Sequence, residues 1–497
     1  MNVPAVVDGH TRWTRDELER RAAVIAAGLL RRGVTRGGRV ALLAVPSAGA
    51  IAAIHGVGRI GGVIVPLGVT LTAGELAVAG AVTDPQLVLH GPGLADAAAA
   101  LGRPVIALDE LLADELLADE LVADAPFADA PERISPPQAH AQAQLKASTS
   151  APADPALPGA IVLTSGTTGR PKAVVLSAAA LLASADAWLA ALPPATGWLL
   201  AVGLNHVAGL GVVWRAERSR VPLVVLPRPD AAAVAAGLAC DPFPGHVSLV
   251  PTALSRILDA AAGAPAPATL RAVPLGGGAI PPELVTRAIA AGWPVVPTYG
   301  LSEAGSGVTA LATSEAVLHP ASAGRPLPGV EVRIGDADDD GVGEIQVASA
   351  ALFTGYLGDP AATAAAFTDD GWLRTGDLGR LDAEGRLSVV DRRTDRIVRG
   401  GENVSPSEVE AVLLEHPEIA EAAVVARRDA EFGHVAVAVL VVRNGAAGPG
   451  DDELTRFCRD RLAAFKVPAG FVRVAALPRT ASGKIRRAEL RASLEDQ

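Results

Sequence analysis

The stretch Leu163-Thr164-Ser165-Gly166-Thr167-Thr168-Gly169-Arg170-Pro171-Lys172 is the most informative part of this sequence. It follows an apolar run, 160–163, that is typical of a buried strand. Its glycines allow a tight turn whose N–H groups can surround an anion, and Lys172 adds positive charge. A polar hairpin loop has the same composition, and the spacing is not that of a Walker motif. The stretch alone predicts a triphosphate loop and leaves the hairpin alternative open.

The composition indicates a globular chain of more than one domain. The 497 residues, half of them hydrophobic and 20% charged, exceed one ordinary core. A net charge of -11 argues against a nucleic-acid-binding surface. Cys240 and Cys458 match no metal-ligand spacing, so a reducing, cytoplasmic location is expected. No signal peptide is expected, because residues 1–12 are short, mixed in character and followed by charges. No membrane span is expected, because the longest uncharged segment, 40–58, is interrupted by Pro46 and several glycines.

Strand-like and helix-like patterns alternate through the first 300 or so residues. Thr14 followed by Glu17, and Thr72 followed by Glu75, are capping-box signatures at the starts of two expected helices. Such alternation predicts parallel, helix-covered sheets, whose ligands collect at the carboxyl ends of the strands. Several of the expected strands end on glycine or polar clusters. The sequence therefore predicts a site where these strand ends converge.

The pattern changes in the last third of the chain. From Glu331 short alternating strands predict a β-subdomain, and charge density rises at 391–396. We expect an α/β fold with a large N-terminal domain at 1–391 and a small α+β C-terminal domain at 392–497. A five-residue acidic repeat that begins at Asp109 is expected to be helical, and the tract up to Pro158 reads as a surface linker.

Five motifs in a fixed order carry a family resemblance. After the glycine-rich stretch come Tyr-Gly-Leu-Ser-Glu at 299–303, Arg-Thr-Gly-Asp at 374–377, Asp-Arg-Arg at 391–393 and Pro-Arg-Thr-Ala-Ser-Gly-Lys at 478–484. With these motifs the sequence resembles the adenylate-forming, AMP-binding superfamily, which includes acyl- and aryl-CoA synthetases. The resemblance covers nearly the whole chain. It implies an enzyme that uses ATP to convert a carboxylate into an acyl-adenylate and then passes the acyl group to a thiol.

The resemblance also implies an ATP site with Mg²⁺. The glycine-rich loop and Lys172 would hold the β- and γ-phosphates, and Ser302 would contact the α-phosphate. Asp377, assisted by Arg392, would bind the ribose, while three glycines and Tyr299 would enclose the adenine. Glu303 would bind Mg²⁺, a hard cation suited to a carboxylate. The implied ATP-binding set is Thr164, Ser165, Gly166, Thr167, Thr168, Gly169, Lys172, Gly276, Gly277, Gly278, Tyr299, Ser302, Asp377 and Arg392.

The resemblance implies that the C-terminal domain is mobile and carries a catalytic residue. Lys484, by itself an ordinary solvated charge, would reach the cleft and stabilise charge that develops in the transition state. Thr394 takes the hinge position, where many members carry aspartate or lysine. Gly400 and Gly401, with Glu402 and Asn403, would line the tunnel for the pantetheine arm of CoA. The same glycines serve equally as a β-turn.

The acid-binding residues implied are His206, Gly300 and Arg215. His206 aligns with the histidine that borders the acyl pocket in the superfamily, and it is expected to be catalytic or to contact the acid. Arg215 lies in an apolar helical pattern. Its side chain either snorkels to the surface or pairs with a second carboxylate on the substrate.

Some stretches resemble the o-succinylbenzoate–CoA ligases of menaquinone biosynthesis, whose substrate is a dicarboxylate. Asn205 and Ala208 depart from that pattern beside the expected pocket. Another aryl or short-chain acid, a carrier-protein phosphopantetheine in place of CoA, and a non-catalytic ATP-binding scaffold remain as alternatives. Neither nucleic acid nor membrane is an expected partner, and a homodimer is left open. The matching stretches are 206–209, 214–215, 275–278, 322–327, 391–395 and 400–403.

Overall fold

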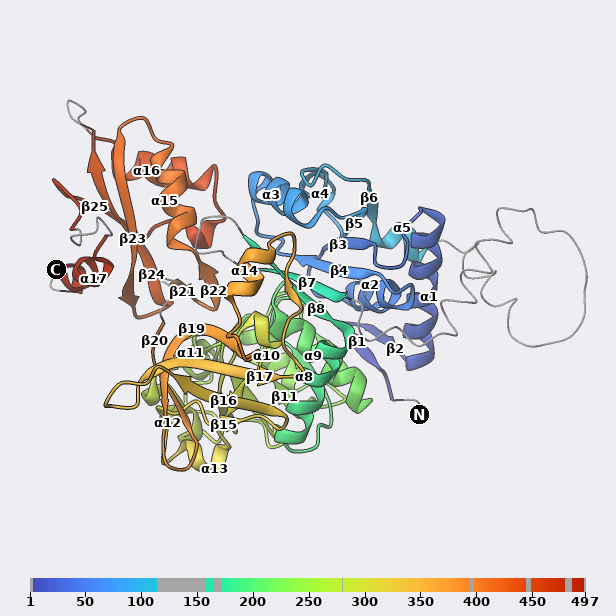
Figure 1. Cartoon of the computed structure of the whole chain (residues 1–497). Helices are drawn as coiled ribbons and strands as arrows, with labels where there is room; N and C mark the ends of the chain where they lie inside the picture. The colour runs from blue at the N-terminus through green and yellow to red at the C-terminus, as the bar shows by residue number, and fades with distance from the viewer. Residues whose placement is uncertain are drawn as a thin grey trace, which may run out of the picture.

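The computed structural model describes residues 3–113, 158–164, 171–278, 280–392, 397–443, 448–478 and 485–495. A large part formed by the first 390 or so residues lies beside a smaller C-terminal part (Figure 1). Within the described ranges, no helix is both long and apolar enough to cross a membrane.

A seven-stranded sheet is at the centre of the large part. Five of its strands, β7, β4, β3, β5 and β6, are parallel, while β8 and β18 form an antiparallel edge. The sheet is therefore mixed rather than wholly parallel. The strands, in spatial order, are β18 (Gly355–Tyr356), β8 (Lys172–Ser177), β7 (Pro158–Thr164), β4 (Val63–Leu67), β3 (Arg39–Leu43), β5 (Leu87–His90) and β6 (Val105–Ala107).

The glycine-rich stretch connects β7 and β8, and these strands pair antiparallel with Thr164 opposite Lys172. The hairpin alternative raised by the sequence is thus correct for the connectivity. A hairpin loop can still present its backbone to an anion, so the phosphate-binding interpretation is compatible with this topology. Residues 165–170 lie outside the described ranges.

A second sheet packs beside the first, and its strands come from distant parts of the chain. β1 (Val6–Asp8) pairs parallel with β10 (Leu223–Val225), a contact for which the sequence carries no local signal. The other strands of this sheet are β2 (Thr11–Trp13), β9 (Trp198–Leu200) and β11 (His246–Val247). A short third sheet holds β12 (Val273–Leu275), β13 (Val295–Tyr299), β14 (Thr309–Ala310) and β15 (Arg325–Pro326).

Two helices of the large part begin at the capping boxes that the sequence predicts. Thr14 and Thr72 are N-caps of complete capping boxes, with Glu17 and Glu75 as their partners. The main helices are α1 (Arg15–Arg31), α2 (Ala48–Arg59), α3 (Ala73–Thr83), α8 (Ala178–Ala191), α9 (Val207–Ser219), α10 (Ala231–Leu238), α11 (Pro251–Ala260) and α12 (Pro282–Ala290). The shorter ones are α4 (Ala95–Ala99), α5 (Leu108–Leu112), α13 (Thr313–Ala316) and α14 (Pro360–Ala365). Residues 109–112 of the acidic repeat are helical in α5, which ends at Leu112. The rest of the repeat from residue 114 and the expected linker up to residue 157 lie outside the described residues.

The expected β-subdomain is present as a four-stranded antiparallel sheet. It contains β16 (Val330–Gly335), β17 (Gly343–Ser349), β19 (Leu373–Leu381) and β20 (Leu387–Arg392). Asp377 on β19 lies opposite Arg392 on β20 in the strand register. This pairing brings together the two residues expected to bind the ribose.

The C-terminal part has a sheet and apolar clusters of its own. Its strands are β21 (Ile397–Arg399), β22 (Glu402–Val404), β23 (Ile419–Asp429), β24 (Gly433–Val442) and β25 (Gly470–Arg473). Its helices are α15 (Pro406–Leu414), α16 (Asp451–Arg459), α17 (Arg487–Glu495) and the short 3-10 helix η2 (Ala464–Lys466). The boundary after residue 391 stays a prediction.

Candidate functional site

A cavity of about 810 Å³ lies where strands β7, β9, β12 and β13 end and where the β21–β22 turn meets the large part. Convergence of glycine and polar clusters at strand ends is what the sequence predicts for this fold class. Of the residues expected to bind ATP, metal, acid or CoA, this cavity is lined by Thr164, Lys172, His206, Arg215, Gly276, Gly277, Gly300, Ser302, Glu303, Asp377, Gly400 and Gly401.

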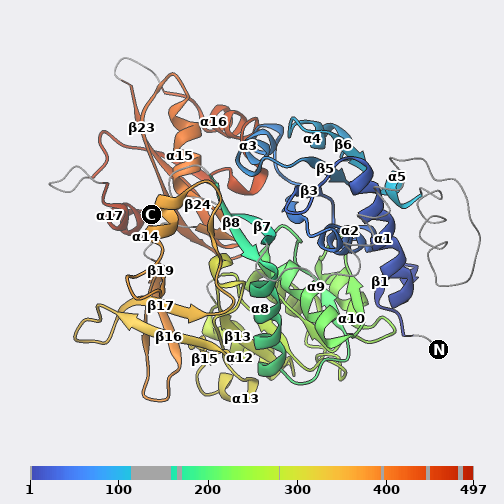
Figure 2. The ribbon, with the colours of Figure 1, turned by 45° about the vertical axis from the view of Figure 1, so that its right-hand side comes forward.

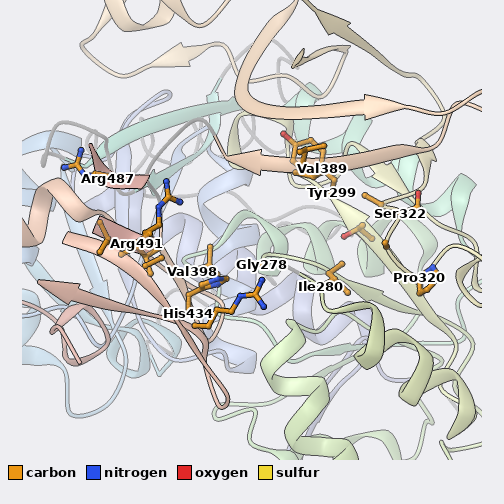
Figure 3. Close-up of a pocket in the computed structure, with 18 of the residues that line it drawn as sticks. Gly278, Ile280, Tyr299, Pro320, Ser322, Val389, Val398, His434, Arg487 and Arg491 are labelled. Atoms are coloured by element: carbon orange, nitrogen blue, oxygen red, sulfur yellow. The ribbon is translucent and has the colours of Figure 1, made fainter. Parts of the chain in front are cut away.

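Gly278 and Tyr299 line an adjoining cavity of about 490 Å³, and Thr298 borders both. Figure 3 shows Tyr299, Val389 and Ser322 on one wall and Val398, His434 and Arg491 from the C-terminal part across from them. The expected adenine-binding glycines thus lie on either side of the junction between the two cavities. Ser165, Gly166, Thr167, Thr168, Gly169, Thr394, Lys484 and the side chain of Arg392 lie outside the described residues.

The expected ribose-binding carboxylate is held in a fixed orientation. Tyr299 Oη donates a hydrogen bond of 2.8 Å to Asp377 Oδ2, and the Asp377 backbone N–H donates to Thr375 Oγ1 at 3.1 Å. The side chains of Tyr299 and Asp377 are both buried. Tyr299, which is expected to stack on the adenine, therefore also contacts Asp377, the residue expected to bind the ribose.

We expect Asp377→Asn to raise the KM for ATP roughly 10- to 100-fold, because a hydrogen bond to a charged group contributes about 1.5–3 kcal/mol. ATP–pyrophosphate exchange at varied ATP concentration measures this. Tyr299→Phe is the matched control, because it removes the Tyr299–Asp377 hydrogen bond and leaves the carboxylate. A KM that stays at the wild-type value in Asp377→Asn would remove this residue from the nucleotide site.

Lys172 and Glu303 are connected through Tyr356. Glu303, on the 3-10 helix η1 (Ser302–Ala304), is 5% exposed, and its Oε1 accepts a hydrogen bond of 2.9 Å from Tyr356 Oη. Lys172 Nζ lies 4.4 Å from the centroid of the Tyr356 ring. The cation and the carboxylate thus border the same end of the cavity. The described residues contain no cluster of three or more metal-ligating side chains. A lone carboxylate fits Mg²⁺ that takes its other ligands from nucleotide phosphates and water.

Two glycines are required by close backbone approaches at the cavity wall. A Cβ at Gly300 would lie 1.6 Å from the Ser306 carbonyl oxygen. Gly401 has φ of +91°, and a Cβ there would lie 2.9 Å from the Val250 side chain. The β21–β22 turn can therefore approach the large part only with glycine at this position.

His206 faces a carboxylate from the C-terminal part. Its Nε2 lies 3.4 Å from Glu402 Oε2 and 3.3 Å from Asn205 Nδ2. Burial acts to raise the pKa of Glu402, but the hydrogen bond to His206 and the charge of Lys466 lower it overall. The Asn205 departure from the expected motif thus sits against the histidine itself.

Arg215 does not snorkel to the surface. Its side chain on α9 is 2% exposed, and the guanidinium lies 5.0 Å from the Trp188 ring and 5.1 Å from the Trp198 ring. Nη1 donates to Ser248 Oγ at 3.4 Å, a long hydrogen bond. Burial lowers the pKa of Arg215 to about 9, so the group is still a cation at pH 7.

The surroundings of Arg215 are rich in hydrogen-bonding groups and poor in negative charge. Arg215 Nε, Trp188 Nε1 and Ser306 Oγ are buried without a partner among the described residues, and all three residues line the cavity. Within the same ranges no carboxylate forms an ion pair with Arg215. A buried cation with unpaired neighbours is unfavourable unless something compensates it. The cavity can therefore accept an anionic, acceptor-rich ligand group at this end.

Sequence reasoning missed several cavity residues because they become neighbours only in the fold. Ser306 follows the Tyr-Gly-Leu-Ser-Glu motif by three residues, and this nearness in sequence was a usable signal. Other members have no motif of their own, since each lies on an element with an ordinary local pattern. The missed residues that contact expected ones are Trp188, Ser248, Thr298, Ser306 and Tyr356.

Comparison with known proteins identifies the family. The model of the AMP-binding enzyme family matches residues 1–357, and that of the AMP-binding enzyme C-terminal domain matches residues 408–484. The chain belongs to the AMP-binding enzyme family. A relative of this AMP-binding enzyme, the 2-succinylbenzoate–CoA ligase of Bacillus licheniformis, is 40% identical over 337 residues, which are 66% of this chain and 69% of the relative.

Two solved structures of one Bacillus subtilis enzyme are similar to this AMP-binding enzyme to different degrees. A doubly substituted o-succinylbenzoate–CoA synthetase bound to the product analogue OSB-NCoA is 29% identical, with a TM-score of 0.87 over 99% of this chain and 96% of that one. The same enzyme in complex with AMP is also 29% identical, with a TM-score of 0.69 over 98% and 95%. Identity and coverage are nearly equal, so the two scores reflect a difference in three-dimensional arrangement.

Proposed function

We propose that this chain is an AMP-forming acid–CoA ligase whose acid substrate is o-succinylbenzoate. Membership of the AMP-binding enzyme family supports ATP-dependent activation of a carboxylate. The 40% identity to a 2-succinylbenzoate–CoA ligase supports this acid. We infer a role in menaquinone biosynthesis from the resemblance to the o-succinylbenzoate–CoA ligases of that pathway. Free cysteines at 240 and 458 are compatible with a cytoplasmic location.

The substrate assignment rests mainly on Arg215, which is buried and has no carboxylate partner among the described residues. A dicarboxylate needs two recognition points, one at the reacting carboxyl group and one at its second carboxylate. Arg215, with Ser248, Ser306 and Trp188 around it, supplies donors and charge for the second. A guanidinium binds a carboxylate through two parallel hydrogen bonds, which adds geometric selectivity. A monocarboxylic aryl acid would leave this cation without compensation.

The first half-reaction takes place at the phosphate end of the cavity. A carboxylate oxygen attacks the α-phosphorus of ATP, the bond to pyrophosphate breaks, and an acyl-adenylate results. We assign Thr164, the 165–169 loop and Lys172 to the leaving pyrophosphate, Ser302 to the α-phosphate, and Glu303 to Mg²⁺, which neutralises phosphate charge when bound. Asp377 and Arg392 hold the ribose. Lys484 stabilises charge on the reacting oxygens.

The second half-reaction transfers the acyl group to CoA. The thiol sulfur attacks the acyl carbon, its proton is lost, and AMP leaves. We assign Gly400 and Gly401 to the passage of the pantetheine arm, because both line the cavity on the C-terminal side. Residues 1–391 and 392–497 act as two domains in this scheme, with Thr394 at their hinge. All of the assigned residues come from one chain, so the site is compatible with a monomer or a homodimer.

An acid panel tests the proposed function. ATP–pyrophosphate exchange is measured with o-succinylbenzoate, benzoate and short-chain acids, and thioester formation is then followed with CoA or a phosphopantetheinylated carrier protein. We expect exchange to be fastest with o-succinylbenzoate and the thioester to form with free CoA. Preference for benzoate would overturn the substrate, transfer only to a carrier would overturn the acceptor, and absence of exchange would leave an ATP-binding scaffold.

A further inference from the structure

Two capping boxes in this chain have the same local geometry and different surroundings. In α1, Glu17 Oε2 accepts from the Thr14 N–H at 2.6 Å and from its hydroxyl at 2.9 Å. In α3, Glu75 Oε2 accepts from the Thr72 N–H at 2.8 Å and from its hydroxyl at 2.9 Å. Only Glu75 is also contacted by the C-terminal part, where the Ala463 N–H donates to Oε2 at 3.1 Å.

Lys466 completes a buried ion triad at this contact. Its Nζ lies 2.6 Å from Glu75 Oε1 and 2.7 Å from Glu408 Oε1, and the lysine is 7% exposed. Burial acts to lower the pKa of Lys466, but the two carboxylates raise it overall. Thr72 Oγ1, whose hydrogen is directed at Glu75, also lies 3.3 Å from the Arg461 carbonyl oxygen. The triad therefore joins α3, in the part matched by the first family model, to residues in the part matched by the second.

The segment that carries Lys466 also supports the turn over the cavity. The 3-10 helix η2 contacts strand β22, and Arg399 Nη1 donates to the carbonyl oxygens of Ala464 and Phe465 at 3.3 and 3.1 Å. The β21–β22 hairpin in turn places Gly400, Gly401 and Glu402 on the cavity wall. Figure 2 shows α3 beside the C-terminal part that contains this hairpin. A continuous set of contacts thus runs from α3 through η2 to the hairpin.

We propose that Glu75, Lys466 and Glu408 form an interdomain lock that positions the 397–404 hairpin over the cavity for transfer of the acyl group to the thiol. The proposal rests on the proposed function for the reaction and on the contacts above for the lock. The three side chains are positioning residues, since none of them lines the cavity. The chain also superposes better on the product-analogue complex of the Bacillus subtilis enzyme than on its AMP complex.

If the lock positions the hairpin, its loss should slow acyl transfer to CoA and leave formation of the acyl-adenylate nearly unchanged. Lys466→Met leaves two carboxylates facing each other in a buried site, so the contact between α3 and η2 should open. We expect CoA-dependent turnover of preformed acyl-adenylate to fall about 10-fold or more, with ATP–pyrophosphate exchange within about 3-fold of wild type. Hydrogen–deuterium exchange of the full chain should show lost protection at the Ala463 amide and in α3.

A matched pair of milder variants controls for capping and stability. Glu75→Gln and Glu17→Gln each neutralise the acid of an equivalent capping box, but only Glu75 contacts Lys466. We expect Glu75→Gln to lower thioester formation about 3- to 10-fold and Glu17→Gln to leave it at the wild-type rate.

Equal behaviour of the two glutamine variants, or an equal loss of both half-reactions in Lys466→Met, would overturn the lock. The exchange-protection measurement needs no substrate. If wild-type protein shows no pyrophosphate exchange, the proposed function fails, while an unprotected Ala463 amide in Lys466→Met still supports the lock and a protected one overturns it.

Discussion

Replacing Arg215 with methionine is expected to lower kcat/KM for o-succinylbenzoate about 30-fold or more, because losing one partner of a buried charge pair costs about 2–5 kcal/mol. Benzoate has no second carboxylate, so its kcat/KM should change by less than about 3-fold. Pyrophosphate exchange with each acid measures both values. Methionine keeps much of the side-chain volume and the contact with the Trp188 and Trp198 rings.

The same variant separates recognition from folding. Arg215 is a buried cation without a carboxylate partner among the described residues, so its replacement should leave the melting temperature of the substrate-free protein unchanged or raised. Arg218→Met is the control, because Arg218 lies on the same helix, is half exposed and pairs with Asp186 at 2.8 Å. Equal losses for both acids, or a matching loss in Arg218→Met, would argue against recognition of a second carboxylate by Arg215.

Replacing Lys484 with alanine is expected to abolish pyrophosphate exchange, with a loss of about 100- to 1000-fold or more when an electrostatic donor is removed from a transition state. The binding of ATP, measured by calorimetry, should change much less, because the other phosphate-binding residues remain. Arg486→Ala is a neighbouring control, since Arg486 is exposed and lies 3.7 Å from Glu489. Pyrophosphate exchange at the wild-type rate in Lys484→Ala would show that Lys484 is not catalytic in the first half-reaction.

Local sequence signals predicted the starts of helices well, because the interactions that cap a helix are made by residues close together in the sequence. Thr14 and Thr72 cap the helices that their glutamates predicted, since a capping box involves only four consecutive residues. Glu303 lines the cavity because it follows the carboxyl end of β13, where the strand ends of an α/β fold collect ligands. Asp377 reaches the same cavity from the middle of β19 in the antiparallel β-subdomain, and that arrangement depends on tertiary packing. The antiparallel pairing of β7 with β8 was left open by the sequence as the hairpin alternative. The addition of β18 to the same edge was missed, because it pairs Gly355 with Val175 from a distant part of the chain.

The glycine-rich stretch illustrates what the sequence by itself determined: a strand followed by a loop and, together with the four later motifs, the family to which the chain belongs. Its phosphate-binding role stays a prediction. Tertiary structure alone decided the environment of single charges. Arg215 is buried beside Trp188 and Ser248, and Glu75 receives Lys466 from the opposite end of the chain. The physical reason is that propensity and capping are fixed by neighbours in sequence. Desolvation and ion pairing depend instead on which distant groups the packed chain brings within a few ångströms.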